Sequence, residues 1–225
     1  MAGITIPLGA LLARVERIRP RWLEAELRHS VIAFGGGILL AAVSLVLVPR
    51  GVEAVPAWVV LPAVGLGGVV FMAIDRQIAR SGGSMSQLVA MIADFLPEAV
   101  ALGAMFATGE PGAVLLAVLI ALQNLPEGFN AYREVMARGE VSAGWVFRLF
   151  ALLALIGPAA AWIGLVWLAD RPELTGVVML FAAGGILYLT FQDIAPQARL
   201  QRHWAPSLGA VLGFMLGLAG QLLLV

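Results

Sequence analysis

Seven apolar segments, each long enough to cross a lipid bilayer as an α-helix, dominate this sequence and restrict what it can fold into. A helix rises 1.5 Å per residue, so about 20 apolar residues span the hydrocarbon core of a bilayer. The expected spans cover residues 31–48, 57–74, 87–107, 112–131, 145–168, 174–194 and 206–225. Only 12% of the residues are charged, whereas soluble domains have about 25%. The sequence therefore predicts an all-α, polytopic membrane helix bundle that forms one domain over residues 1–225.

The first 30 residues are expected to lie outside these spans. The apolar piece before residue 13 contains Pro7 and Gly9 and is too short to cross a bilayer. We interpret it as a half-span or an interfacial piece. Residues 14–29 are rich in arginine, and they are predicted to form a surface helix at the membrane.

The basic residues are distributed unevenly between the two sides of the predicted bundle. All 14 are arginines; twelve fall on one side, and only Arg50 and Arg171 fall on the other. Because arginine is enriched on the cytoplasmic side of membrane proteins, residues 14–29 are expected in the cytoplasm. Since this rule accounts for the positions of the arginines, they give no reason to expect binding to nucleic acid. We expect membrane lipid as a partner and no nucleic acid.

Two similar motifs place polar side chains inside apolar spans. They are Asp94-Phe-Leu-Pro-Glu98 and Gln123-Asn-Leu-Pro-Glu127. In each motif the first and last side chains are four residues apart and therefore share a helix face. The proline between them has no N–H and frees the carbonyl oxygen four residues earlier. A carboxylate in the middle of a membrane costs about 2.5 to 3.5 kcal/mol, so the motifs predict a cation as the compensating partner.

The same side chains have another interpretation. Asp94 and Glu98 could be neutral acids that hydrogen-bond neighbouring helices, and Gln123 and Asn124 could join helices in the same way. An intramembrane hydrolase is not expected, because the chain has no His-Glu-x-x-His or Gly-x-Ser-x-Gly motif and no histidine at membrane depth. We therefore expect no enzyme activity, no catalytic residue and no organic cofactor.

An internal similarity relates the first expected span to the sixth. Phe34-Gly-Gly-Gly37 aligns with Phe181-Ala-Ala-Gly184 at an offset of 147 residues, and the same offset aligns Pro49 with Pro196. The two spans run in opposite directions, which predicts inverted repeats around a central helix pair that carries the polar motifs. Secondary transporters commonly have this arrangement, with the binding site near the bilayer midplane. Chance similarity between glycine-rich apolar helices is the alternative.

The paired motifs resemble those of the ZIP family of divalent-metal transporters, especially its bacterial GufA-like branch, whose motifs are of the His-Asn-x-Pro-Glu-Gly type. Residues 34–42 and 181–188 look like the second and seventh spans of that family. The resemblance implies an eight-helix bundle, a homodimer, and transport of Zn²⁺, Fe²⁺ or Mn²⁺ into the cytoplasm by alternating access. It also implies the inner (plasma) membrane of a bacterium. The N-terminal apolar piece would then be the end of a truncated first span.

The sequence departs from this family in the fourth and sixth spans. Asp94 and Phe95 stand where relatives carry His-Asn, so a carboxylate replaces an imidazole and an amide ligand is lost. Gly157 precedes Pro158 where many relatives have glutamate. The residues expected to bind the metal are Asp94, Glu98, Gln123, Glu127 and Asn124. Since oxygen ligands suit Mn²⁺ or Fe²⁺ better than Zn²⁺, we predict selectivity shifted away from zinc. A transport-inactive relative with a regulatory or structural role is the alternative.

Overall fold

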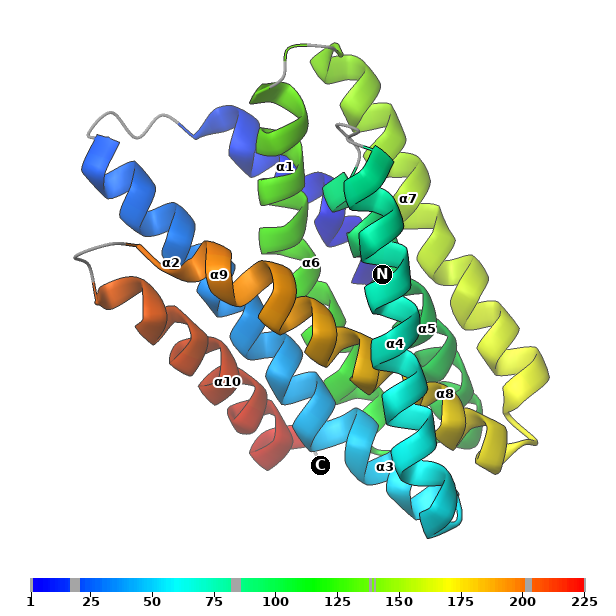
Figure 1. Cartoon of the computed structure of the whole chain (residues 1–225). Coiled ribbons are helices and arrows are strands. Elements are labelled where there is room, and N and C mark those ends of the chain that lie inside the picture. Colours follow the sequence, from blue (N-terminus) through cyan, green and yellow to red (C-terminus); the bar gives the residue numbers. More distant parts are fainter. Residues whose placement is uncertain are drawn as a thin grey trace.

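The computed structural model describes residues 2–16, 21–81, 86–137, 139, 141–200 and 204–224, and these residues form a bundle of helices (Figure 1). Seven helical stretches in this part of the chain are long and apolar enough to cross a membrane. They are Ala25–Ala54, Ala57–Arg80, Met91–Thr108, Gly112–Ala137, Ala143–Leu168, Pro172–Ala198 and Ala205–Leu224. Each contains most of one predicted span. The prediction of an all-α, multi-pass membrane bundle is therefore confirmed.

Several spans are built from consecutive helical elements without a break. The first comprises α2 (Arg21–Ala42), the π-helix η2 (Val43–Leu47) and α3 (Val48–Ala54). The next three are α4 (Ala57–Ser81), α5 (Ser86–Thr108) and α6 (Gly112–Ala137). The fifth comprises α7 (Ala143–Ile163) and the π-helix η3 (Gly164–Leu168). The sixth comprises α8 (Pro172–Leu189), the π-helix η4 (Thr190–Ile194) and α9 (Ala195–Ala198), and the seventh is α10 (Ala205–Leu224).

The antiparallel spans give the bundle two distinct ends. We call one the arginine-rich end: α2, α5, α7 and α10 begin there, α4, α6 and α9 finish there, and Arg76, Arg80, Arg133 and Arg199 lie there. Arg50 in α3 and Arg171 before α8 lie at the opposite end. The helix order thus separates the arginines as the sequence predicts.

The prediction that residues 14–29 form a separate surface helix is wrong. Arg14 lies in the last turn of α1 (Thr5–Val15), whereas residues 21–29 form the first turns of α2 and continue into the apolar span. Residues 21–33 contain neither proline nor glycine, so nothing interrupts the helix where its charged part meets its apolar part. Residues 17–20 lie outside the described part of the chain.

The N-terminal apolar piece forms a short helix packed along α6. It begins with the 3₁₀-helix η1 (Ala2–Ile4) and continues as α1. Two glycines permit the close approach: a Cβ on Gly9 would lie 2.1 Å from a carbonyl oxygen of α6, and one on Gly128 would lie 2.3 Å from a carbonyl oxygen of α1. Arg133 of α6 forms an ion pair with Glu16 at the end of α1. The piece therefore lies along α6 between Asn124 and Arg133, and its assignment as a half-span or an interfacial piece stays a prediction.

Two π-helical segments support the internal repeat. The offset of 147 residues that relates Phe34 to Phe181 also relates η2 to η4, because these segments begin at residues 43 and 190 and end at residues 47 and 194. Pro49 and Pro196 each follow the segment by two residues. A proline cannot donate its backbone hydrogen bond, which weakens the preceding α-helical turn, and π turns and prolines both bend helices. The two halves therefore carry the same irregularity at equivalent places.

Each repeat packs against a helix from the other half of the chain. Figure 1 shows α10 beside α2 and α4 beside α8. Gly37 of α2 lies against the backbone of α10 at Ala210, and its equivalent Gly184 of α8 lies against the backbone of α4 at Val64. Small residues permit such close contacts, which hold helices together in lipid. Since α6 contacts α2 and α10 while α5 contacts α8 and α4, the α5–α6 pair is central, as predicted.

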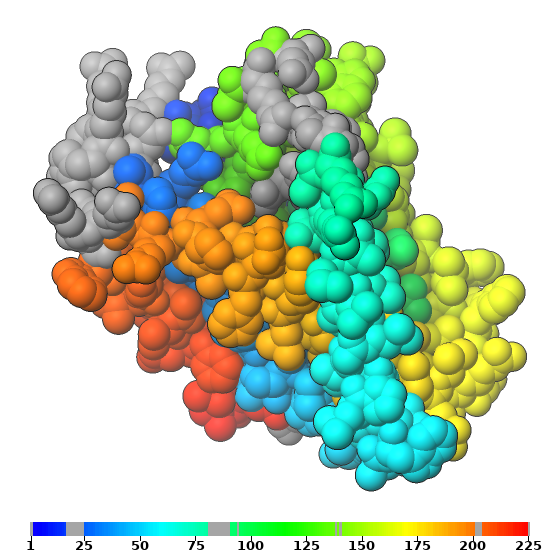
Figure 2. Space-filling view, viewed as in Figure 1, coloured from blue at the N-terminus to red at the C-terminus, as the bar shows by residue number. Residues whose placement is uncertain are grey.

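The peripheral helices present apolar faces to the surroundings. Only 17% of the apolar window of α4 is buried inside the bundle, against 67% for the span that contains α2. Figure 2 shows α4 on the surface of the molecule, beside α8 and α9. Its exposed side chains include Trp58, Leu61, Leu66 and Val69. Large contiguous apolar surfaces are unusual on soluble monomers, and here they suit contact with lipid tails.

Candidate functional site

The two polar motifs meet where α5 and α6 lie side by side, near the midpoint of each helix. Pro97 lies inside α5 and Pro126 inside α6, and both helices continue through their proline. Nε2 of Gln123 donates a hydrogen bond of 2.7 Å to Oε2 of Glu98. Both side chains are fully buried. The structure therefore joins a carboxylate of the first motif to an amide of the second in the interior of the bundle.

This hydrogen bond determines which oxygen atoms remain for a ligand. Because its amide nitrogen donates to Glu98, Gln123 keeps Oε1 as an acceptor, and this buried atom accepts no hydrogen bond from the described residues. Asn124 is similar: Nδ2 lies 3.4 Å from the carbonyl oxygen of Ala2, and buried Oδ1 has no partner within the described ranges. A buried acceptor without a partner costs about 1 to 3 kcal/mol. The remaining oxygen of Gln123, beside the carboxylate of Glu98, is therefore available to a cation or a donor.

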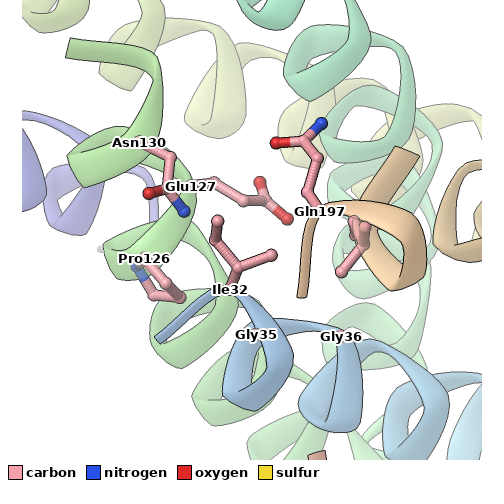
Figure 3. Close-up of a pocket in the computed structure, with 8 residues that line it drawn as sticks. Ile32, Gly35, Gly36, Pro126, Glu127, Asn130 and Gln197 are labelled. Atoms are coloured by element: carbon pink, nitrogen blue, oxygen red, sulfur yellow. The ribbon is translucent and has the colours of Figure 1, made fainter. Parts of the chain in front are cut away.

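Glu127 lies one helical turn from Gln123, toward the arginine-rich end. Both of its carboxylate oxygens are buried. The residue also lines a pocket, and Gly35 and Gly36 of α2 form another wall of this pocket (Figure 3). A Cβ on Gly35 would lie 3.1 Å from the ring of Pro126, and one on Gly36 would lie 2.8 Å from the side chain of Ile194, so the glycines permit close packing at this wall. The carboxylate is thus covered, but it borders a pocket on the arginine-rich side of the buried pair.

The structure brings together some, but not all, of the residues predicted to bind a metal. Glu98 and Gln123 are joined in the buried centre, and Glu127 lies one turn away. Asn124 is buried next to Gln123 in α6, but its amide nitrogen faces Ala2 of η1. Asp94 belongs to α5, but its side chain lies outside the described part of the structure, so its place in the site stays a prediction. Among the described residues, no three histidine, aspartate or glutamate side chains gather closely enough to hold a metal ion. A cation here would need amide oxygens as well as carboxylates.

Histidine contributes nothing to the described centre. The ring of His29 in α2 lies 2.6 Å from the carbonyl oxygen of Ala25, one turn earlier in the same helix. His203 lies outside the described ranges. The centre that the structure does show is therefore built from oxygen ligands.

Phe95, which stands where the resemblance predicts an amide ligand, fills the space beside Gly157. Its side chain is buried, and a Cβ on Gly157 would lie 2.4 Å from the tip of its ring. A Cβ on Gly3 of η1 would lie 3.3 Å from the same ring atom. The ring thus fills the space beside Gly157, where the resemblance predicts an amide ligand.

Gly157→Ala is expected to destabilise the protein, because the new methyl group forces the ring of Phe95 to move. Overpacking of this kind costs about 1 to 3 kcal/mol. Thermal unfolding of the detergent-purified protein measures the effect. Phe95→Leu in the same chain removes the obstructing ring and is expected to restore part of the loss. Equal unfolding temperatures for Gly157→Ala and the wild type would show that the ring does not fill this space.

Several polar side chains from different spans interact at the arginine-rich end, and the sequence alone did not predict these interactions. Tyr188 of α8 donates a hydrogen bond of 2.9 Å to Oδ2 of Asp75 of α4. Asp193 of η4 interacts electrostatically with Asp75 and with Glu134 of α6. Isolated polar residues on different spans form no motif, so their spacing carries no signal that they meet.

Gln197 of α9 is a further polar residue that sequence reasoning missed. It lines the same pocket as Glu127. The internal repeat offered a signal, because the offset of 147 residues relates Gln197 to Arg50 and Ile32 to Met179. Arg50 and Met179 line a pocket at the opposite end, whereas Ile32 and Gln197 line the pocket beside Glu127. Two lining residues of each pocket therefore correspond under the repeat.

Comparison of the chain with protein-family models and with curated proteins gives no match. The candidate site is therefore supported by its own geometry: a fully buried carboxylate, two buried amide oxygens without donors among the described residues, and a second carboxylate that borders a pocket. Chemically, this arrangement can replace the water shell of a cation with protein oxygens.

Proposed function

We propose that the protein transports a divalent metal cation across the membrane through the centre formed around Glu98 and Gln123. The observation that carries this proposal is the hydrogen-bonded, fully buried pair at the midpoint of two spans, with an amide oxygen left over. Ionisable groups at membrane depth are costly and generally mark an ion or substrate pathway. The resemblance of the paired motifs to the ZIP family supports the same function.

The residues of this centre have complementary roles in binding the substrate ion. Glu98 and Glu127 supply two negative charges, which balance one dication. The amide oxygens of Gln123 and Asn124 fill coordination positions without adding charge. With Asp94 as a third ionised carboxylate, the formal charge of the metal-bound site would be −1. One of the three carboxyl groups is therefore expected to hold a proton before the metal enters and to release it on entry.

Direction, location and assembly follow from the arginine distribution and from the resemblance. The arginine-rich end faces the cytoplasm in this proposal, because basic residues are enriched on that side of membrane proteins. The pocket beside Glu127 then lies on the cytoplasmic side of the buried pair. Uptake into the cytoplasm, the inner membrane of a bacterium and a homodimer are proposed on the resemblance to ZIP transporters.

A transport-inactive membrane protein with a structural or regulatory role is the second candidate. Phe95 favours it, because an apolar ring fills space where an amide ligand is expected. The hydrogen bond between Gln123 and Glu98 would then serve to hold α6 against α5. Metal uptake by reconstituted vesicles distinguishes the two candidates.

Proteoliposomes that contain the protein are expected to take up Mn²⁺ or Fe²⁺ in preference to Zn²⁺. The physical reason is the ligand set, because carboxylate and amide oxygens suit the harder ions, whereas imidazole and thiolate favour zinc. Initial rates with each ion at equal concentration, compared with protein-free vesicles, measure the preference. Uptake of Zn²⁺ alone would contradict the predicted selectivity, and uptake of no dication would favour the structural role.

A further inference from the structure

A row of oxygen-bearing side chains continues from the buried centre along α6 toward the arginine-rich end. Gln123, Glu127, Asn130 and Glu134 are spaced by four, three and four residues. This spacing keeps them on one face of the helix, and at 1.5 Å per residue the row is about 16 Å long. Because polar groups in a membrane span are expensive, a continuous row of them indicates a route for a polar solute.

Asn130 lies in the middle of this row and has an oxygen available. Its side chain is only 8% exposed, and buried Oδ1 accepts no hydrogen bond from any residue that the structure describes. Asn130 lines the same pocket as Glu127 and Gln197. Figure 3 shows the carboxylate of Glu127 and the side-chain oxygen of Gln197 directed into the same space between α6 and α9. Three side chains that carry an oxygen atom therefore border one pocket; Asn130 turns its nitrogen toward Glu127 in Figure 3, and half a turn of its amide would bring the oxygen into the pocket.

Acidic residues from three helices lie on the arginine-rich side of the buried pair, and Asp193 directly precedes Ile194, which lines the pocket. Glu134 of α6 and Asp75 of α4 both interact electrostatically with Asp193 of η4. Clustered charge of one sign attracts counter-ions and raises their local concentration. A cation in the pocket would thus be attracted by negative charge on the neighbouring helices.

We propose that Glu127, Asn130 and Gln197 form a second cation-binding station between the buried pair and the arginine-rich end. The station rests on the proposed transport function and adds a release step to it. Glu127 belongs to both stations, since Gln123 lies one turn away on one side and Asn130 one turn away on the other. One carboxylate with two amides binds a dication more weakly than the buried centre does, and weak binding favours onward movement.

Mn²⁺ binding to the detergent-purified full chain, measured by calorimetry, tests the station. Glu98→Gln removes a carboxylate that belongs to the buried centre and not to the second station. We expect this variant still to bind Mn²⁺ at the second station, with lower affinity than the wild type. Adding Asn130→Leu or Gln197→Leu is expected to weaken this residual binding about tenfold or more. Gln192→Leu is the matched control, because Gln192 is exposed at the same end of the sixth span and does not line the pocket.

Measurements of Mn²⁺ uptake and a second substitution at Asn130 complete the test. Asn130→Leu is expected to slow Mn²⁺ uptake about tenfold, and Asn130→Asp, which adds a charge at nearly the same size, is expected to tighten binding about tenfold. If the Asn130 and Gln197 variants bind and transport Mn²⁺ like Gln192→Leu while Glu98→Gln abolishes transport, the station is refuted and the transport function stands. If the wild type neither binds nor transports any dication, the proposed function itself fails.

Discussion

Glu127→Ala is expected to reduce Mn²⁺ uptake by proteoliposomes about 100-fold or more. Glu127 lies between the buried pair and the pocket, so its removal takes a carboxylate from both proposed stations. Truncating a buried charged partner typically costs about 2 to 5 kcal/mol, and about 3 kcal/mol corresponds to a factor of more than 100. Initial uptake rates at equal amounts of reconstituted protein measure the effect.

Two variants control for effects on folding and for general loss of charge. Glu127→Asp keeps the carboxylate and is expected to retain part of the uptake. Glu173→Ala removes an exposed carboxylate from the first turn of α8, far from the centre, and is expected to transport like the wild type. Wild-type uptake by Glu127→Ala would contradict the role of this carboxylate in transport.

Gly103→Ala is expected to lower the stability of the protein by about 3 kcal/mol, near the upper end of the cost of overpacking. Gly103 lies on the face of α5 that contacts α7, and a Cβ there would lie 1.8 Å from the carbonyl oxygen of Ala161. The opposing atom belongs to the backbone and cannot rotate away. Gly164 of η3, which continues α7, packs against α5 in the same way, because a Cβ on it would lie 1.9 Å from the carbonyl oxygen of Val100. The two helices would have to separate.

Gly65→Ala supplies the matched control for this prediction. Gly65 lies within α4, and a Cβ there meets nothing within 4 Å. Because alanine is favoured over glycine in helices by about 1 kcal/mol, this variant is expected to be as stable as the wild type or slightly more stable. Thermal unfolding in the same detergent compares the three proteins. Gly103→Ala and Gly65→Ala unfolding at one temperature would argue against close contact between α5 and α7.

The seven spans were predictable because each depends on a local property, the length of an apolar run. The start of the first helix was not predictable in the same way. The arginines and glutamates in residues 21–29 suggested a surface helix, but no glycine or proline separates these residues from the apolar span, and one helix runs through both. A helix ends where its hydrogen bonding is interrupted, and a change from charged to apolar residues does not interrupt it. Charge therefore locates the membrane boundary better than it locates the helix boundary.

The candidate site was predictable in its residues but not in its contacts. Spacing placed Glu98 and Gln123 at similar depth, yet their hydrogen bond depends on how α5 and α6 are rotated about their axes. Contacts from other parts of the chain influence that rotation, such as Gly103 against α7 and Gly128 against α1. Gln197 belongs to a third element, so no pattern within α6 could connect it with Glu127 or Asn130.

The repeat-related pockets have a thermodynamic consequence. At the end opposite to Gln197, Nε of Arg50 lies 3.6 Å from Oε2 of Glu110, and both residues line the pocket there. In the proposed transport function, the shared bend would let the two halves exchange conformations, so that each end of the bundle adopts the shape of the other. Two states related in this way would differ little in free energy. A few kcal/mol from differential binding of one cation is therefore enough to reverse their populations.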